Sequence, residues 1–322
     1  MSTRQPRIGV VMDPIETIKP AKDSTLAMML AAQRRGWSLV YMQQGDLRLR
    51  DGVAWGRGLR VRVTDDARHW FEAGDTWADR LDTLDVILMR KDPPFDMEFI
   101  HTTYMLERAQ LAGTLVVNDP VALRNMNEKA YTAWFAQCTP PTLITRRKDD
   151  MRAFLAEHGR IVIKPLDGMG GRSVFVVDRN DPNRNVVMET LTADERRYAM
   201  AQRYLPEIAD GDKRILLIDG EPVERLLARV PGGDDPRGNL VAGATGEARP
   251  LSARDRWIAD EVGPELARHG VLFAGLDVIG DHLTEINVTS PTGIRELDAQ
   301  CGLDIADQLM AKIARRLETR DA

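Results

Sequence analysis

The sequence predicts an α/β fold for about the first 120 residues and a strand-rich α+β region for the remainder. In the first part, short apolar runs alternate with segments whose apolar residues recur at helical spacing, which favours βα units around an open parallel sheet. In the second part, short runs of β-branched and aliphatic residues dominate. The length of 322 residues exceeds what one hydrophobic core usually supports, so length alone predicts about two domains.

The elements of the first part are short and regularly spaced. Buried strands are predicted at Ile8–Met12, Leu39–Met42, Val86–Met89 and Leu115–Val117. Helices are predicted at Ser24–Arg35, with Asp23 or Ser24 as the N-cap, and at Met97–Ala112. The segment Arg50–Arg62 is less regular, and it fits a small hairpin or an insertion.

After Pro120 the pattern changes. Two helical segments over about 121–137 precede strands at Ile161–Lys164, Ser173–Val177, Met200–Tyr204, Arg214–Ile218 and Leu226–Val230. A helix over about 253–269, a hairpin over Phe273–Val288 and a last helix over about 304–319 follow. Residues 231–247 are rich in Gly, Asp and Pro, which predicts a mobile loop of the kind that closes active sites. A plain surface loop is the alternative.

Composition excludes several classes of protein. Hydrophobic residues make up 43% and charged residues 29%, which is typical of a globular chain. With 44 basic and 49 acidic residues, the chain has no basic excess for binding nucleic acid or an anionic membrane surface. We find no targeting segment and no apolar run long enough to span a membrane. The two cysteines, Cys138 and Cys301, are expected to be reduced thiols in a cytoplasmic protein.

A lysine at the end of a predicted strand precedes a glycine-rich turn, in the run Lys164-Pro-Leu-Asp-Gly-Met-Gly-Gly171. Glycines let backbone N–H groups converge on an anion, and the lysine adds a positive charge, so the run fits a phosphate site. The glycines precede a strand rather than a helix and lack P-loop spacing, which argues against P-loop and Rossmann sites. An ordinary hairpin turn is the alternative.

The hairpin predicted over Phe273–Val288 carries three oxygen-bearing side chains. With a three-residue loop at Gly280-Asp281-His282, Asp277 lies opposite Glu285. Because strand side chains alternate, Glu285 and Asn287 share one face, and Asp277 joins them there. Two carboxylates and an amide oxygen fit Mg²⁺ that also binds substrate phosphates. A solvated polar face is the alternative.

Two arginines at the ends of predicted strands suit an anionic substrate. Arg214 begins one strand and Arg229 lies near the end of another, and guanidinium groups bind phosphate or carboxylate oxygens in pairs. Exposed arginines at strand ends are also common. The five histidines lack the paired spacing of zinc ligands, so zinc is not expected.

With these residues in view, the sequence resembles the ATP-grasp ligases, and within them the prokaryotic-type glutathione synthetase family. The resemblance covers nearly the whole chain and rests on the runs Val11–Pro14, Ile87–Phe95, Asn127–Lys129, Lys164–Gly171, Gly211–Arg214 and Glu285–Thr292. The chain departs from some members at Thr245, where they have an arginine.

The resemblance implies three domains and a reaction. The domains are an N-terminal substrate-binding α/β domain over 1–123, a central ATP-grasp lid over 124–203 and a C-terminal ATP-grasp domain over 204–322 with a mobile loop at 231–247. The reaction is ATP-dependent ligation of γ-glutamylcysteine and glycine to glutathione through an acyl phosphate, with release of ADP and phosphate. A homotetramer in the cytoplasm is also implied.

The resemblance also assigns roles to individual residues. Catalysis is assigned to Arg214, Arg229 and Arg237. Binding of Mg²⁺, or of Mn²⁺ in its place, is assigned to Asp277, Glu285 and Asn287. The ATP-binding residues are Lys129, Lys164, Gly168, Met169, Gly170, Gly171, Gln202, Tyr204, Leu205, Asp212 and Asn287. The substrate-binding residues are Asp13, Arg90, Ser290, Pro291, Thr292 and Gly293.

Two other functions remain open at this point. Another ATP-grasp carboxylate–amine ligase, such as a D-alanine–D-alanine ligase or a glutamate-adding ligase, would share the nucleotide site and differ in the N-terminal segments. A non-catalytic ATP-binding protein on the same fold, comparable to the synapsins, would bind ATP without turnover. The complete set of predicted acidic ligands and strand-end arginines favours an enzyme.

Overall fold

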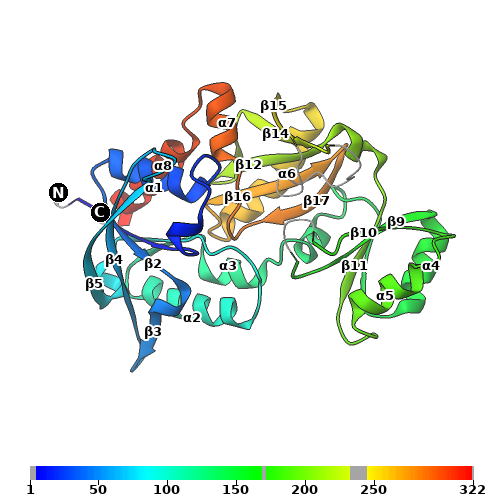
Figure 1. Cartoon of the computed structure of the whole chain (residues 1–322), viewed down its shortest axis with the longest axis horizontal. Coiled ribbons are helices and arrows are strands. Elements are labelled where there is room, and N and C mark those ends of the chain that lie inside the picture. The colour runs from blue at the N-terminus through cyan, green and yellow to red at the C-terminus, as the bar shows by residue number, and fades with distance from the viewer. Residues whose placement is uncertain (1–4, 169–171, 233–244, 321–322) are drawn as a thin grey trace.

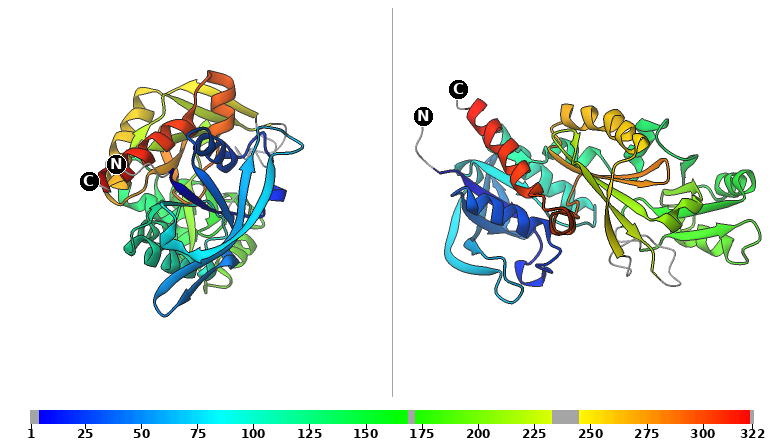
Figure 2. Two further views of the ribbon diagram at one scale, coloured as in Figure 1. Left: turned by 90° about the vertical axis from the view of Figure 1, so that its left-hand side faces the viewer. Right: turned by 90° about the horizontal axis from the view of Figure 1, so that it is seen from above.

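The computed structural model describes residues 5–168, 172–232 and 245–320, and the strands in this part of the chain form three sheets. The N-terminal sheet lies at one end of the molecule, and the sheet formed within residues 142–203 lies at the other (Figure 1). The third sheet lies between them. Figure 2 shows the same order along the long axis when the molecule is seen from above.

The N-terminal sheet has a parallel part in the order β2-β1-β6-β7. Its strands are β1 (Arg7–Val11), β2 (Ser38–Met42), β6 (Val86–Met89) and β7 (Leu115–Val117). Helix α1 (Ser24–Arg34) begins where the Asp23 carboxylate accepts the N–H of Leu26 at 2.6 Å, and α2 (Met97–Leu111) begins in the same way at Asp96. The predicted strands and helices of this part are confirmed.

An antiparallel extension makes this sheet mixed. It consists of β3 (Leu47–Arg50), β4 (Val53–Val63) and β5 (Phe71–Arg80), with β4 paired to β2. Asp51 and Gly52 join β3 to β4 with φ values of 51° and 76°, as a two-residue hairpin turn requires. The segment predicted as a small hairpin or an insertion is therefore mostly one long strand.

The sheet at the opposite end is antiparallel, in the order β10-β9-β11-β8. Its strands are β8 (Thr142–Thr145), β9 (Arg160–Pro165), β10 (Phe175–Asp178) and β11 (Ala199–Arg203). Helices α4 (Lys148–His158) and α5 (Arg184–Thr192) pack on it, and neither helix was predicted from the sequence. The buried residues of this sheet and its two helices form a hydrophobic cluster of their own.

The middle sheet has the order β15-β14-β12-β16-β17, with a short β13 beside β12. Its strands are β12 (Asp212–Ile218), β13 (Glu221–Pro222), β14 (Arg225–Val230), β15 (Thr245–Pro250), β16 (Phe273–Ile279) and β17 (His282–Asn287). The loop predicted over 231–247 is too long, because Thr245–Glu247 pair with β14 as the first residues of β15. Residues 233–244 lie outside the described part.

Helices pack on both faces of the middle sheet. Helix α6 (Ala253–Arg268) packs on the first face, and α7 (Ile294–Cys301) and α8 (Ile305–Arg320) pack on part of the second. Along β12, Arg214, Leu216 and Ile218 share this second face. Leu216 and Ile218 are buried against α7 and α8. Arg214 lies beyond the part of this face that the two helices cover.

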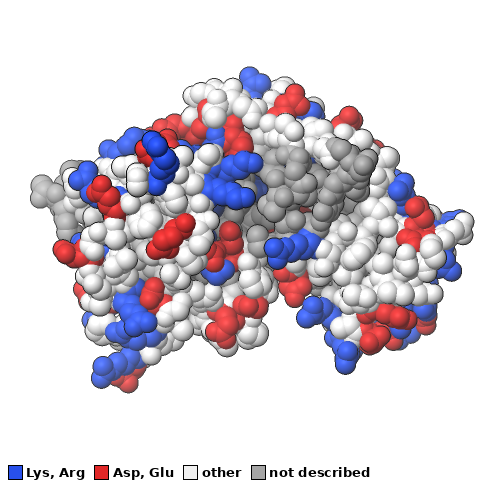
Figure 3. All heavy atoms as spheres, in the orientation of Figure 1, with Lys and Arg blue, Asp and Glu red and all other residues white. Residues whose placement is uncertain are grey.

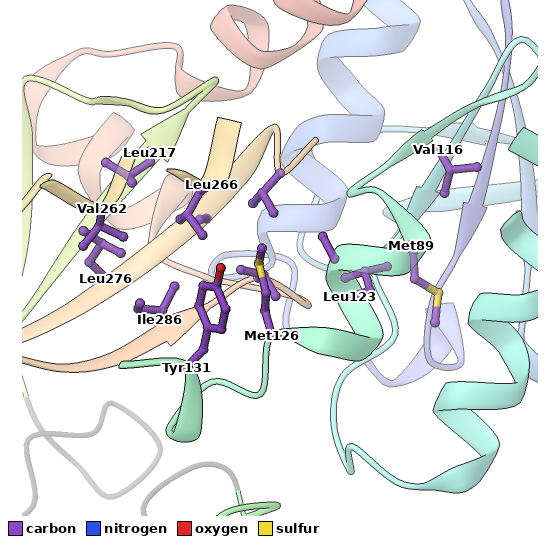
Figure 4. Packing of buried hydrophobic residues seen from close by; sticks show 14 of the residues in the cluster. Met89, Val116, Leu123, Met126, Tyr131, Leu217, Val262, Leu266, Leu276 and Ile286 are labelled. Atoms are coloured by element: carbon purple, nitrogen blue, oxygen red, sulfur yellow. The ribbon is translucent and has the colours of Figure 1, made fainter. Parts of the chain in front are cut away.

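The N-terminal and middle sheets share their hydrophobic core. One cluster continues from Met89 and Val116, through Leu123 on α3 (Pro120–Asn125), to Leu276 and Ile286 in the middle sheet (Figure 4). A second cluster joins α1 to α8. The part of the middle sheet that carries Arg214 therefore belongs to the same hydrophobic core as the N-terminal sheet. This part faces the end sheet, whose Lys164 reaches Glu285.

The surface shows no concentration of one charge on the visible face. Basic and acidic side chains are interspersed there (Figure 3), in agreement with the net charge of −5. Among the described residues, no helix has both the length and the apolarity needed to cross a bilayer.

Candidate active site

The β16–β17 hairpin brings Asp277 opposite Glu285, but not through the loop that the sequence predicted. The loop has two residues, Gly280 and Asp281, because Ile279 pairs with His282. The register then shifts by one residue between Asp277 and Val278, as in a β-bulge. In strict alternation from Leu283, which is buried in the core, Glu285 would also point into the core. The bulge at Thr284 turns Glu285 to the polar face.

Four charged side chains lie side by side across three strands of this face. Arg214 on β12 binds the carboxylate of Asp277 on β16 with two nitrogens, Nε to Oδ1 at 2.6 Å and Nη2 to Oδ2 at 3.1 Å. Arg229 on β14 contacts Asp277 Oδ2 at 3.0 Å and Asp212 Oδ2 at 2.5 Å. The partners in each ion pair lie on adjacent strands or, for Arg229 and Asp277, on the two strands that flank β12. The pairing register of these strands therefore sets the positions of the four charges.

Glu285 extends this charged face toward the end sheet. Lys164 on β9 places its Nζ 3.3 Å from Glu285 Oε1, and Lys129 places its Nζ 3.6 Å from the same oxygen. The Lys129 ammonium also contacts the Glu128 carboxylate and donates to the Gly168 carbonyl at 2.7 Å. Lys129 and Lys164 are both buried.

Burial and neighbouring charges shift the pKa values of this group in both directions. Burial alone would raise the pKa of Asp277, but Arg214 and Arg229 lower it below its ordinary value. Lys129 and Lys164 likewise lower the pKa of Glu285 against the effect of burial. Burial raises the pKa of Asp212 to about 7, although Arg229 opposes the shift.

Glu128 is a fourth carboxylate, partly buried, beside this group. Burial and the nearby charge of Glu285 raise its pKa to about 7, although Lys129 opposes the shift. A small pocket opens beside it, and its lining comes from all three parts of the molecule: Pro93, Phe95, Met126, Glu128, Leu166, Asp167, Val288 and Thr289.

The polar face of the β16–β17 hairpin suits a metal ion whose remaining coordination positions are filled by other ligands. Asp277, Glu285 and Asn287 lie on the same face of β16 and β17, and Asn287 pairs with Gly275. The amide nitrogen of Asn287 is buried and has no hydrogen-bond partner among the described residues. Within those residues, no three His, Cys, Asp or Glu side chains gather closely enough to hold a metal ion alone. Two carboxylates and an amide therefore fit Mg²⁺ only together with phosphate or water oxygens.

The strand expected to bind adenine lies at the edge of the same region. Gln202 on β11 is buried, and its Nε2 donates to Thr142 Oγ1 at 3.0 Å. The N–H of Tyr204 donates to the Arg160 carbonyl at 3.1 Å, and the Arg160 guanidinium lies 4.4 Å from the centre of the Tyr204 ring. Leu205 is buried next to it. Gln202 thus lies on β11 and Tyr204 and Leu205 follow it, and no contact among the described residues joins them directly to the charged face.

A second group of predicted residues surrounds the segment 290–293 after β17. Arg90 Nη2 donates to the Pro291 carbonyl at 2.9 Å, and Arg214 Nη1 donates to the Thr292 carbonyl at 3.2 Å. Ser290 Oγ donates to Asp92 Oδ1 at 2.6 Å. Gly293 precedes α7 with a φ of +120°, which disfavours any other residue. Because Arg214 touches both groups, the two groups form one continuous site.

Asp13 and Arg90 flank the point where the order of the parallel strands reverses. Asp13 follows β1 and Arg90 follows β6. These two strands are neighbours, and the sheet continues from β1 to β2 on one side and from β6 to β7 on the other. Open α/β sheets bind ligands at such a point, beyond the carboxyl ends of the strands. The Asp13 carboxylate already has partners within the protein: it contacts the Lys91 ammonium at 2.9 Å and accepts the Asp92 N–H at 3.0 Å.

Arg90 is a buried cation without an acidic partner within ion-pair distance among the described residues. Its guanidinium donates to Thr25 Oγ1 at 3.1 Å and lies 5.8 Å from the centre of the Phe273 ring. Burial lowers its pKa to about 10, although Asp92 and Asp23 oppose the shift. A buried charge usually has an opposite partner, so Arg90 suits a substrate carboxylate.

Some predicted residues lie outside the described part, and some important ones were missed. Met169, Gly170, Gly171 and Arg237 belong to the first kind. The missed residues are Asn127, Glu128, Gly275 and Thr284. Of these, Asn127 and Glu128 stood in a recognised run without an assigned role. The importance of Gly275 and Thr284 depends on sheet register, for which the sequence carries no local signal.

Two protein-family models match the chain. The prokaryotic glutathione synthetase N-terminal domain matches residues 7–124, and the prokaryotic glutathione synthetase ATP-grasp domain matches residues 128–302. A glutathione synthetase from Pseudomonas aeruginosa is 59% identical over 314 residues, which cover 98% of this chain and 99% of the relative. One from Salmonella typhimurium is 55% identical over 311 residues, covering 97% and 99%.

Solved structures share the fold at much lower sequence identity. D-cycloserine synthetase DcsG superposes with a TM-score of 0.69 at 15% identity, covering 97% of this chain and 99% of that one. The ATP-grasp ligase PsnB, with a phosphomimetic variant of its minimal precursor, Mg and ADP, gives 0.64 at 16% identity, covering 97% and 99%. The expected fold class, an α/β domain followed by an ATP-grasp fold, is confirmed.

Proposed function

We propose a role for each part of the site from one premise: the chain belongs to the prokaryotic glutathione synthetase family. It is an ADP-forming ligase that uses ATP to join γ-glutamylcysteine and glycine into glutathione. The roles that follow for individual residues are our proposal.

The two lysines bind the nucleotide phosphates in this proposal. Lys129 and Lys164 are buried, and both ammonium groups point to Glu285. Phosphate oxygens entering between them would gain two positive charges in a dry environment. The adenine lies beside Gln202, Tyr204 and Leu205. Gly168 and Asp212 complete the described part of this site.

Asp277, Glu285 and Asn287 hold Mg²⁺, for which Mn²⁺ can substitute. The support is their common face, on which two carboxylates and the amide oxygen of Asn287 can meet one cation. When bound, the metal ion neutralises charge on the transferring phosphoryl group. Arg214 and Arg229, which now bind Asp277, would then be free to move to phosphate oxygens nearby.

The chemical steps need positioning and charge neutralisation more than covalent work by the protein. The cysteinyl carboxylate of γ-glutamylcysteine attacks the γ-phosphorus of ATP, so ADP leaves and an acyl phosphate forms. The amine of glycine then attacks the acyl carbon, and phosphate leaves. Arg214 and Arg229 stabilise the charge on the transferring oxygens in both steps. Arg237 was assigned a related role, and it lies outside the described residues.

The dipeptide lies at the carboxyl ends of β1 and β6. Arg90 binds one of its carboxylates, because this guanidinium is buried and, within the described part of the chain, contacts only a carbonyl, a hydroxyl and a ring. Asp13, Ser290, Pro291, Thr292 and Gly293 shape the remainder of the site. The bond from Arg214 to the Thr292 carbonyl supports a peptide site next to the phosphoryl-transfer site.

The observation that carries the proposal is the meeting of Arg214, Asp277 and the 290–293 segment, because it joins a nucleotide site to a peptide site. The test is a coupled assay of ADP release with γ-glutamylcysteine and glycine, each omitted in turn. We expect rapid ADP release only with both substrates. Release with D-alanine instead would indicate a different ligase, and ATP binding without release would indicate a non-catalytic protein.

Two further properties belong to the proposal. The two free cysteines and the need for ATP support a location in the cytoplasm. The homotetramer implied by the family resemblance stays a prediction, and light scattering during gel filtration measures it directly.

A further inference from the structure

The Asn127 side chain links the segment that carries Lys129 to the chain that follows β9, next to the bond from Lys129 Nζ to the Gly168 carbonyl. Asn127 Nδ2 donates to the Leu166 carbonyl at 2.9 Å, just beyond the end of β9. Its Oδ1 accepts the N–H of Lys129 at 3.1 Å and the N–H of Ala130 at 2.9 Å. Both ends of the amide are therefore used, one for the Lys129 segment and one for the β9 segment.

This clamp lies midway between the two lysines that meet at Glu285. Lys129 is two residues after Asn127, and Lys164 is two residues before Leu166. Only an amide offers a donor and an acceptor in this geometry, since a carboxylate lacks the donor and a hydroxyl is too short to reach both sides. The hydrogen bonds of Asn127 thus fix two backbone segments whose ammonium groups lie 3.6 Å and 3.3 Å from Glu285 Oε1.

A separate contact holds the same segment to the middle sheet. The N–H of Ile286 donates to the Glu128 carbonyl at 2.8 Å, and this backbone bond does not involve the Asn127 side chain. Loss of the Asn127 amide would therefore loosen the β9 side of the junction, where the bond from Lys129 Nζ to the Gly168 carbonyl remains, and leave the β17 side in place. The expected result is a change in lysine spacing rather than unfolding.

We propose that Asn127 is a positioning residue that sets the spacing of the Lys129 and Lys164 ammonium groups for binding nucleotide phosphates. Asn127 does not itself touch the nucleotide in this proposal. The inference rests on the phosphate-binding role proposed above for the two lysines, and the experiment below separates the two claims.

The main variant is Asn127→Ser. Serine keeps an oxygen that can cap the Lys129 turn, but it cannot reach the Leu166 carbonyl. We expect the dissociation constant of ADP–Mg²⁺, measured by calorimetry, to rise about tenfold, the effect of one broken, partly buried hydrogen bond whose acceptor is left unsatisfied. The KM for γ-glutamylcysteine should stay unchanged, because Asn127 has no contact with that side of the site.

A matched control removes a similar clamp far from the site. Gln33 Nε2 donates to the Val63 carbonyl at 2.8 Å, and its Oε1 accepts the Val63 N–H at 2.9 Å. Gln33→Ser should lower the melting temperature without changing ADP affinity. If Asn127→Ser fails to fold, Asn127→Asp and Gln33→Glu form a second matched pair, since each keeps the acceptor and loses the donor.

A double-mutant cycle with Lys129→Met decides between the possible outcomes. If Asn127 acts through Lys129, the effect of Asn127→Ser on ADP affinity should shrink to less than threefold when Lys129 is already absent. Full additivity, or normal ADP affinity in Asn127→Ser, overturns the inference. Normal ADP affinity in both Lys129→Met and Lys164→Met overturns the proposed phosphate site instead.

Discussion

Gly275 shows how the absence of a side chain shapes the catalytic face. A Cβ added there would lie 2.8 Å from Arg214 Cδ and 3.0 Å from Pro291 Cβ. Arg214 cannot easily move aside, because two of its nitrogens bind Asp277. Gly275 thus leaves the space through which Arg214 reaches both Asp277 and the 290–293 segment.

We expect Gly275→Ala to reduce kcat about tenfold, because overpacking by one methyl group costs roughly 1–3 kcal/mol and here displaces Arg214. Steady-state kinetics and thermal unfolding would be measured together. Gly45→Ala is the matched control, since a Cβ there meets nothing within 4 Å. Unchanged kcat in Gly275→Ala would show that Arg214 adapts or has no catalytic role.

Glu285 combines two functions in the proposed mechanism, because it is a metal ligand and the common partner of Lys129 and Lys164. Glu285→Gln keeps the shape and removes the charge, so we expect turnover to fall by roughly 10²-fold or more. The kinetics would be followed at limiting and saturating Mg²⁺. Glu265→Gln, which removes a carboxylate on the surface of α6, should leave turnover unchanged. Near-normal turnover of Glu285→Gln at limiting Mg²⁺ would exclude the metal assignment.

At the scale of the elements, the hairpin β16–β17 shows how far sequence reasoning reaches. Alternation of polar and apolar residues predicted that Asp277, Glu285 and Asn287 share a face, and they do. The loop length was wrong, since a three-residue loop would have placed Leu283 on the polar face with Glu285. The bulge at Thr284 resolves this conflict by burying Leu283 and Ile286 together. Bulges depend on the partner strand, so the local sequence does not reveal them.

Other elements were missed for different reasons. Helix α4 buries only Met151 and Leu155 on one side, and its charged residues hide the helical period. The strands β1, β2, β6 and β7 were predictable because each is a continuous apolar run. Motifs in the sequence supplied most residues of the candidate site, whereas contacts such as that of Arg90 with Pro291 join residues 201 apart in sequence. Only the tertiary structure brings such pairs together.

The junction between α7 and α8 provides a test of pH dependence. Asp298 Oδ1 accepts the Ile305 N–H at 3.1 Å, and burial raises the Asp298 pKa to about 6 from an ordinary value of 3.8. The folded chain therefore holds a proton that the unfolded chain releases, and stability from this group falls as pH rises from about 4 to 6. Above about pH 6, Asp298 is ionised in both the folded and the unfolded chain, and its contribution to stability falls no further.

We expect Asp298→Asn to keep the acceptor and remove this loss. The variant should match the wild type near pH 4 and be more stable above pH 6, by about 1 kcal/mol after allowance for the half-exposed position. Urea unfolding at several pH values measures the difference. An advantage that is the same at every pH would show that the charge of Asp298 is not its cause.

At the scale of the whole molecule, the candidate site lies between two units that have separate hydrophobic cores. The N-terminal and middle sheets share two hydrophobic clusters, and Asn118 joins them further by donating to the Phe273 and Val288 carbonyls at 2.7 Å and 2.6 Å. The end sheet of residues 142–203 has its own cluster. Lys164 reaches Glu285 from that separate unit, so the proposed phosphate binding depends on how the two units are held together.

This division predicts two kinds of core mutant. Met151 is fully buried in the end-sheet cluster, and Leu309 on α8 is fully buried in the cluster shared by the other two sheets. Each substitution by alanine should cost roughly 2–5 kcal/mol. Because unfolding is cooperative within a core, Met151→Ala should speed hydrogen exchange in β8–β11, α4 and α5 only. Leu309→Ala should speed it in both the N-terminal and the middle sheet.

Hydrogen exchange followed by mass spectrometry can distinguish these patterns peptide by peptide. Uniformly faster exchange in Met151→Ala would mean that the end sheet does not unfold separately. Confinement of the Leu309→Ala effect to α8 would mean that the N-terminal and middle sheets are not one cooperative unit. With the expected patterns, Met151→Ala should also weaken ADP binding more than its loss of global stability explains, because Lys164 belongs to the unit that opens first.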